Sequence, residues 1–80
     1  MKVPFLDLRV LDAELKQEML KAIESVMDHG RILLGPEVEA LERELAAYCG
    51  VKYALGVGSG TDALTLAVRA VGLGAGDEIV

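Results

Sequence analysis

The sequence has few of the residues from which metal sites and disulfides are built. It contains no tryptophan, one cysteine (Cys49) and one histidine (His29). A lone cysteine cannot form an internal disulfide, so we expect a reducing, cytoplasmic environment. One cysteine and one histidine cannot supply the four ligands of a structural zinc site. We therefore expect no metal.

Basic residues and long apolar runs are also scarce. Eight Lys and Arg face thirteen Asp and Glu, which leaves a net charge of −5. This balance predicts no nucleic-acid partner, because such surfaces are basic. No apolar run approaches the roughly 18–20 residues of a membrane span. The first residues include Pro4 and Asp7 and lack the apolar stretch of a signal peptide.

Apolar residues, in contrast, are abundant for so short a chain. They make up 52% of the 80 residues, and nine glycines accompany them. A domain of this size buries only about 60–65% of its unfolded surface. The composition is typical of the core of something larger, so we expect the chain to be the leading part of a longer domain.

Three segments have the periodicity of amphipathic helices. Residues 11–28 carry an apolar residue every three or four positions, with Asp12 as N-cap and Gly30 beyond the end. Residues 36–49 start on Pro36, which suits a first helical position, and stop before Gly50. Residues 61–71 form the third predicted helix, with Ser59 or Thr61 as its cap.

The remaining segments predict a connector and two strands. Residues 30–36 form a short connector that is unusually apolar. Residues 52–57 are almost continuously apolar, as in a strand buried on both faces, and residues 78–80 start a second strand. With the helix between them, these strands predict a βαβ unit and an α/β fold.

One segment carries a chemical signature. Residues 56–64 join the predicted strand to a helix through three glycines, which let a ligand approach the backbone, and the helix start offers free N–H groups. This arrangement favours phosphate binding, and a plain tight turn before a capped helix remains the alternative. A dinucleotide fingerprint would need glycine in place of Thr61, and a P-loop would need a lysine after Gly60.

The run Gly58-Ser59-Gly60-Thr61-Asp62-Ala63-Leu64 resembles the phosphate-binding motif of the DegT-type nucleotide-sugar aminotransferases. Other segments also resemble this family, in the order in which the family has them. They are Val3–Leu8, Gly30-Arg31 with Leu34–Val38, Tyr48–Ala54 and Gly74–Val80. The resemblance implies fold type I of the transferases that depend on pyridoxal 5′-phosphate (PLP). Residues 1–35 would then be an N-terminal arm, helix and connector, and residues 36–80 the truncated start of the PLP-binding large domain.

The same resemblance implies roles for individual residues. Gly60, Thr61 and Asp62 would hold the PLP phosphate through backbone N–H groups and the Thr61 hydroxyl, with Ser59 supporting the turn. Leu33, Leu34 and Gly35 would border the substrate pocket, or else lie buried at a subunit interface. The Schiff-base lysine is expected beyond residue 80, so no catalytic residue is assigned within the chain.

The implied function belongs to the intact enzyme, and we expect the 80-residue chain alone to be inactive. The enzyme would be a cytoplasmic homodimer that moves an amino group from an amino acid, with glutamate the expected donor, to a keto-sugar nucleotide. The alternatives are a non-catalytic phosphate- or nucleotide-binding α/β module and a PLP-dependent sugar dehydratase.

Four further features have structural interpretations. We expect His29 to favour the dipole at the end of its helix, Cys49 to pack, and the glutamates Glu39, Glu42 and Glu44 to form a solvated helix face. Asp7 is expected to be a solvated or capping acid.

Overall fold

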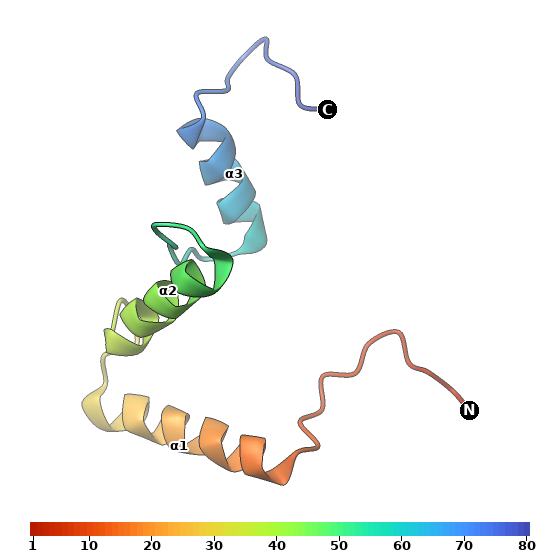
Figure 1. Ribbon diagram of the computed structural model, residues 1–80, viewed down its shortest axis with the longest axis vertical. Coiled ribbons are helices and arrows are strands. Elements are labelled where there is room, and N and C mark those ends of the chain that lie inside the picture. Colours follow the sequence, from red (N-terminus) through yellow and green to blue (C-terminus); the bar gives the residue numbers. More distant parts are fainter. The chain divides into compact units, whose positions relative to one another are not determined.

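The computed structural model describes all residues from Met1 to Val80 and contains three helices. They are α1 (Ala13–His29), α2 (Pro36–Cys49) and α3 (Gly60–Ala70), shown in Figure 1. The chain divides into two units, Met1–Glu39 and Ala40–Val80, and the division falls within α2. All three predicted helices are confirmed, with ends within two residues of those expected.

Helix α1 is closed at both ends by the residues expected from the sequence. The carboxylate of Asp12 accepts hydrogen bonds from the N–H groups of Glu14 (2.9 Å) and Leu15 (3.0 Å). At the other end Gly30 has a φ of +71°, and its N–H donates to the Val26 carbonyl at 2.8 Å. Glycine adopts this left-handed conformation without the penalty that a Cβ brings, so the helix stops there.

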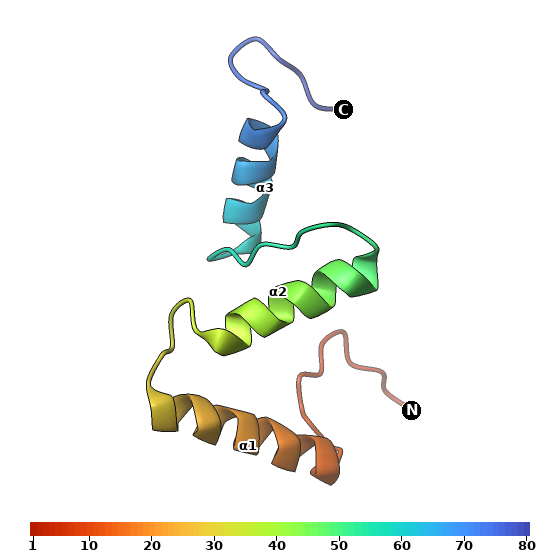
Figure 2. The ribbon, with the colours of Figure 1, turned by 60° about the vertical axis from the view of Figure 1, so that its left-hand side comes forward.

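The arm before α1 follows an irregular path (Figures 1 and 2). Within the arm, Arg9 and Asp7 form an ion pair, with 2.6 Å between Arg9 Nη2 and Asp7 Oδ2. Hydrogen bonds from the Arg9 side chain and backbone hold the pKa of the Asp7 carboxyl below its usual value. The pair is exposed, so its contribution to stability is small.

The connector between α1 and α2 is a tight turn. Leu34 has a φ of +50° and is the only non-glycine residue with a positive φ. Gly35 is buried, and a Cβ at this position would overlap the carbonyl oxygen of Arg31. Glycine is therefore required at residue 35 for space. Helix α2 then begins at Pro36, whose ring fixes the backbone angle that a first helical residue needs.

The two predicted strands, residues 52–57 and 78–80, are not formed, and neither is the βαβ unit. A helix satisfies its N–H and C=O groups within its own segment, whereas a strand needs a neighbouring strand to pair with. In this chain the N–H of Gly56 instead donates to a side chain, the Glu42 carboxylate. Residues 51–59 form an irregular link between α2 and α3.

Helix α3 begins at its cap, Ser59, and ends before Gly72, which has a φ of +81°. The N–H of Leu73 donates back to the Val68 carbonyl at 3.2 Å and closes the last turn. A second turn follows, in which the Asp77 carboxylate accepts from the Gly74 N–H at 2.7 Å.

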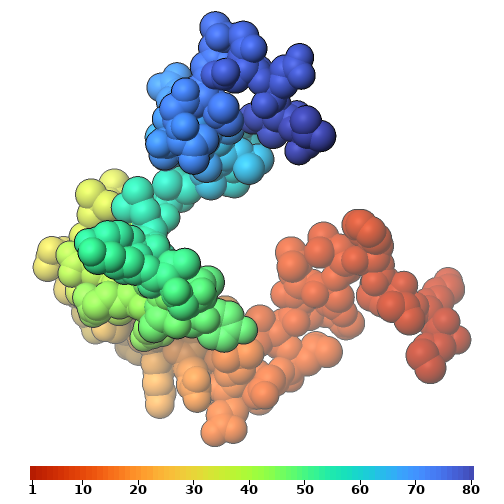
Figure 3. Space-filling model, turned by 45° about the horizontal axis from the view of Figure 1, so that its top comes forward, coloured from red at the N-terminus to blue at the C-terminus, as the bar shows by residue number.

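The apolar helix faces are not covered within these 80 residues. Ala46 is the only buried hydrophobic side chain, at 8% exposure, while Leu15, Met19 and Ile23 on the apolar face of α1 are about half exposed. The arm also has no cover, since Phe5 is fully exposed. The arm is the orange-red end of the chain in the space-filling view (Figure 3). The periodicity correctly predicted the helices, and their apolar faces are largely exposed within this chain. None of the three helices combines the length and apolar character of a membrane-spanning helix.

Candidate functional site: the N-terminus of helix α3

Ser59 determines where α3 starts. Its backbone is extended, with φ −165° and ψ 167°, and its hydroxyl oxygen accepts a hydrogen bond from the Asp62 N–H at 3.1 Å. The Ser59 carbonyl accepts from the Ala63 N–H at 3.0 Å, which is the first bond of the helix. Of the two candidate caps, Ser59 is thus the one used.

Two N–H groups of the first turn remain without an acceptor in the chain, those of Gly60 and Thr61. The Thr61 hydroxyl also makes no internal hydrogen bond, whereas the Thr65 hydroxyl one turn later donates to the Thr61 carbonyl at 2.9 Å. Two free N–H groups at the positive end of a helix, beside a free hydroxyl, form a donor set suited to an anion such as phosphate.

Gly60 adds open space to these donors. Its φ is not positive, and a Cβ built on it would meet no atom within 4 Å. Nothing in the chain itself therefore requires glycine here. A side chain at this position would occupy space next to the free N–H groups, so glycine keeps the approach to them open.

Asp62 does not cap the helix. Its carboxylate folds back toward Gly58, where a Cβ would lie 2.9 Å from Asp62 Oδ2. The two residues line a shallow hollow of about 320 Å³ together with Val57, Thr65 and Leu66. The Asp62 N–H already donates to Ser59, so the predicted role of this N–H toward phosphate requires it to share or leave that bond.

The environment of Glu42 differs from the one expected from the sequence. It was expected on a solvated helix face, but it is half-buried, and its Oε1 accepts from the Gly56 N–H at 2.8 Å. This bond ties α2 to the segment that leads into the Ser59-Gly60-Thr61 turn. The two residues are fourteen apart in sequence, and no local pattern signals such a pairing.

The connector residues Leu33, Leu34 and Gly35 lie together in the tight turn of the other unit. The two leucine side chains are 88% and 81% exposed, whereas Gly35 is buried. His29, expected only to favour the helix dipole, spans this turn: its Nδ1 accepts from the Arg31 N–H at 3.0 Å, and its Nε2 lies 2.7 Å from Glu37 Oε1.

These two contacts assign the histidine tautomer. Because Nδ1 must be unprotonated to accept from Arg31, Nε2 carries the hydrogen and donates it to Glu37. The hydrogen bond from His29 is the main reason why the pKa of the Glu37 carboxyl lies below its ordinary value, and a backbone hydrogen bond at Glu37 adds to the effect.

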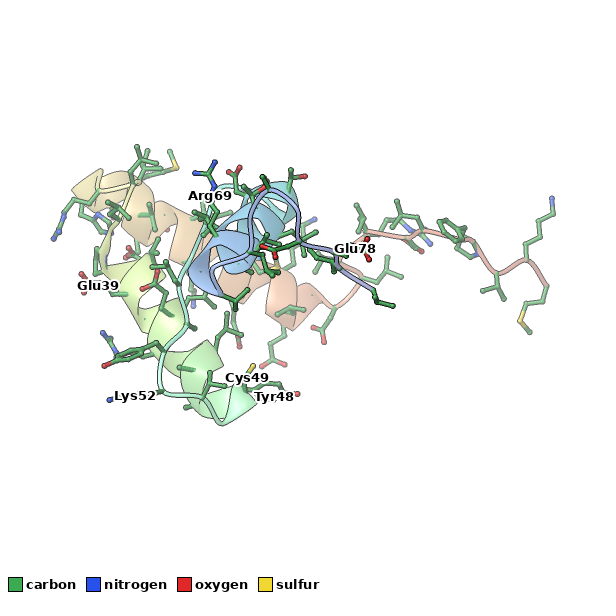
Figure 4. The ribbon with its side chains drawn as sticks, turned by 90° about the horizontal axis from the view of Figure 1, so that it is seen from above. Glu39, Tyr48, Cys49, Lys52, Arg69 and Glu78 are labelled. Atoms are coloured by element: carbon green, nitrogen blue, oxygen red, sulfur yellow. The ribbon has the colours of Figure 1, made fainter.

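The side chains around the end of α2 form no further site. Tyr48 and Cys49 lie at the end of α2, both exposed (Figure 4), so the expected packing of Cys49 is not found. The Lys52 ammonium lies 5.3 Å from the centre of the Tyr53 ring, a cation–π distance. No three His, Cys, Asp or Glu side chains converge as metal ligands.

The arrangement at α3 is a helix N-terminus with two free N–H groups, preceded by a glycine-rich turn. The family model of the DegT/DnrJ/EryC1/StrS aminotransferases matches residues 13–80. The chain belongs to this family. Membership implies the PLP-dependent transferase fold type I, and the chain itself forms three helices and no strand.

Individual relatives agree with this assignment. The chain is 54% identical over 79 residues to a dTDP-3-amino-3,4,6-trideoxy-alpha-D-glucose transaminase of Streptomyces venezuelae, covering 99% of this chain and 21% of that protein. It is 46% identical over 78 residues to a dTDP-3-amino-3,6-dideoxy-alpha-D-galactopyranose transaminase of Aneurinibacillus thermoaerophilus, covering 98% and 22%. It is 48% identical over 80 residues to the erythromycin biosynthesis sensory transduction protein EryC1 of Saccharopolyspora erythraea, covering 100% and 22%.

The chain thus spans about a fifth of the length of these curated relatives. No solved structure matches the chain significantly.

Proposed function

We propose that the full-length protein containing this chain is a PLP-dependent sugar aminotransferase. It moves an amino group from an amino acid, with glutamate the expected donor, to a keto-sugar nucleotide. The proposal is supported by the family membership of residues 13–80 and by the two relatives named as dTDP-sugar transaminases. The structural observation that carries it is the pair of free N–H groups at the start of α3, beside the Thr61 hydroxyl.

The residues at α3 suit the phosphate of PLP. The cofactor phosphate carries up to two negative charges and several acceptor oxygens, and it needs donors without competing partners. Gly60 and Thr61 provide two N–H groups, Thr61 provides a hydroxyl, and the open space at Gly60 lets the phosphate approach. Once bound, PLP supplies the electron sink that amino-group transfer requires.

Ser59 and Asp62 take supporting roles in this proposal. The Ser59 oxygen accepts from the Asp62 N–H, which leaves the Ser59 hydroxyl hydrogen available to the phosphate. The Asp62 carboxylate would repel a phosphate dianion, so we propose that it stays folded back toward Gly58, where its Oδ2 lies 2.9 Å from the position of a Cβ on that glycine. Asp62 contributes its N–H only if that group also turns toward the phosphate.

The substrate segment is proposed to be the connector. Leu33 and Leu34 expose apolar side chains from a turn that Gly35 keeps tight, and such side chains can contact the apolar faces of a nucleotide or sugar. Burial of the same leucines at the interface of a homodimer is the competing assignment. The lysine that reacts with the cofactor, and the acid that holds the pyridine nitrogen, are proposed to lie beyond residue 80. Cytoplasmic location is part of the same proposal.

The test uses the purified full-length protein. We expect it to retain PLP after extensive dialysis and to convert a keto-sugar nucleotide to the amino sugar, with glutamate as donor, detected by mass spectrometry. Retention of PLP with loss of water from the sugar instead of amination would replace the proposal with the dehydratase alternative. Failure to bind PLP would refute the proposal and favour a non-catalytic phosphate-binding module.

A further inference from the structure

The connector adopts a backbone conformation that its own residues do not favour. Leu34 has a φ of +50°, in the left-handed region that side chains with a Cβ rarely occupy. Such a residue keeps its conformation only when surrounding contacts impose it. Leu33 and Leu34 are exposed and supply few contacts, so the constraint has to come from elsewhere in the turn.

His29 and Glu37 supply that constraint. The ring of His29 accepts from the Arg31 N–H on one side and donates to the Glu37 carboxylate on the other, at 3.0 Å and 2.7 Å. These are the only side-chain hydrogen bonds across the connector. They join the last residue of α1, the start of the turn and the first turn of α2, so they restrain the turn at both ends.

We propose that His29 and Glu37 are positioning residues for substrate binding, because they hold the Leu33–Leu34 turn in the shape that contacts the sugar nucleotide. The inference rests on the proposed function. Neither residue touches the reacting atoms, so loss of the pair should raise KM for the sugar nucleotide and leave kcat and PLP affinity unchanged. Both ring nitrogens of His29 take part in hydrogen bonds of this turn.

The chain offers variants that separate the two bonds. His29→Ala removes both, whereas His29→Asn places a carbonyl oxygen where Nδ1 lies and retains only the acceptor for Arg31. Glu37→Ala removes the other partner, and Glu37→Gln retains an acceptor for the Nε2 hydrogen. Glu39→Ala is the matched control, because Glu39 is also an acid of the first turn of α2, and its exposed side chain makes no hydrogen bond.

Two readouts on the full-length protein test the proposal. One is the steady-state KM and kcat for the keto-sugar nucleotide. The other is the hydrogen-exchange rate of the Arg31 amide, which does not depend on activity. For His29→Ala we expect KM to rise roughly 3- to 10-fold. The Arg31 amide, which loses the one hydrogen bond that its N–H makes to the ring, should exchange faster by a similar factor. His29→Asn should restore slow exchange at Arg31. Glu37→Gln should raise KM much less than Glu37→Ala does, and Glu39→Ala should have the KM of the wild type.

Three results would overturn the inference. One is an unchanged Arg31 exchange rate in His29→Ala, and another is an unchanged KM despite faster exchange. The third is an equal rise of KM in Glu37→Ala and Glu39→Ala. If the wild-type protein aminates no sugar nucleotide, the proposed function itself fails and this inference falls with it. The wild-type assay distinguishes that case from the other three.

Discussion

Replacing Thr61 with alanine tests the proposed phosphate site most directly. The Thr61 hydroxyl has no partner in the chain, so its removal breaks nothing that the fold uses. The backbone N–H of residue 61 stays in place. The substitution therefore removes a single charge-assisted hydrogen bond to phosphate.

The expected loss is about 1–3 kcal/mol, the range for a hydrogen bond to a charged group. This corresponds to a PLP dissociation constant raised roughly 5- to 150-fold.

The assay is a fluorescence titration of the full-length apoprotein with PLP. Thr61→Ser keeps the hydroxyl and should bind nearly as well as wild type. Thr65→Ala is the matched control, since the Thr65 hydroxyl is already bonded to the Thr61 carbonyl at 2.9 Å. A dissociation constant for Thr61→Ala within twofold of wild type, or an equal loss in Thr65→Ala, would refute the assignment of this hydroxyl to the phosphate.

Three further predictions follow from the described contacts. Gly35→Ala forces a Cβ against a carbonyl oxygen of the connector and should destabilise the full-length protein by about 1–3 kcal/mol, measured by denaturant unfolding. Gly74→Ala, where a Cβ meets no atom within 4 Å, serves as its control and should be nearly neutral. Glu42→Ala removes the acceptor of the Gly56 N–H and should weaken PLP binding by loosening the segment before α3. Glu42→Gln keeps an acceptor and should bind PLP as the wild type does, so an equal loss of PLP affinity in both variants would count against a role of this hydrogen bond. The pKa of Glu37 is lowered, so its contribution to stability is present above the ordinary value of 4.5 and is lost as the pH falls through the lower folded value; NMR titration of its carboxyl should give a higher pKa once its histidine partner is replaced by alanine.

The helices could be predicted from sequence because each one closes its own hydrogen bonds. Asp12 and Gly30 bound α1 as expected, Pro36 starts α2, and Ser59 starts α3. These signals act over three or four residues, so no distant partner is needed for them to take effect. The donors at the start of α3 follow from the same local rules, which is why the candidate phosphate site could be located from the sequence.

The contacts that hold the connector before α2 and the link before α3 could not be predicted in the same way. The bond from Gly56 to Glu42 crosses fourteen residues, and the His29 ring reaches Glu37 only because the connector turns back. In the sequence, Glu42 is indistinguishable from the other glutamates of its helix. Which of them is half-buried depends on where the link after α2 runs.

The sequence by itself thus determined the three helices, their caps and the glycine-rich helix start of a family member. Only the tertiary structure decides whether residues 52–57 become a strand and which apolar faces are buried. A strand needs a second strand to bond with, and an apolar face needs another surface to pack against. A local sequence pattern predicts the strand or the apolar face, but it does not identify the segment that pairs with it. Within these 80 residues the helices are complete, and the leucines of α1 and the connector remain exposed.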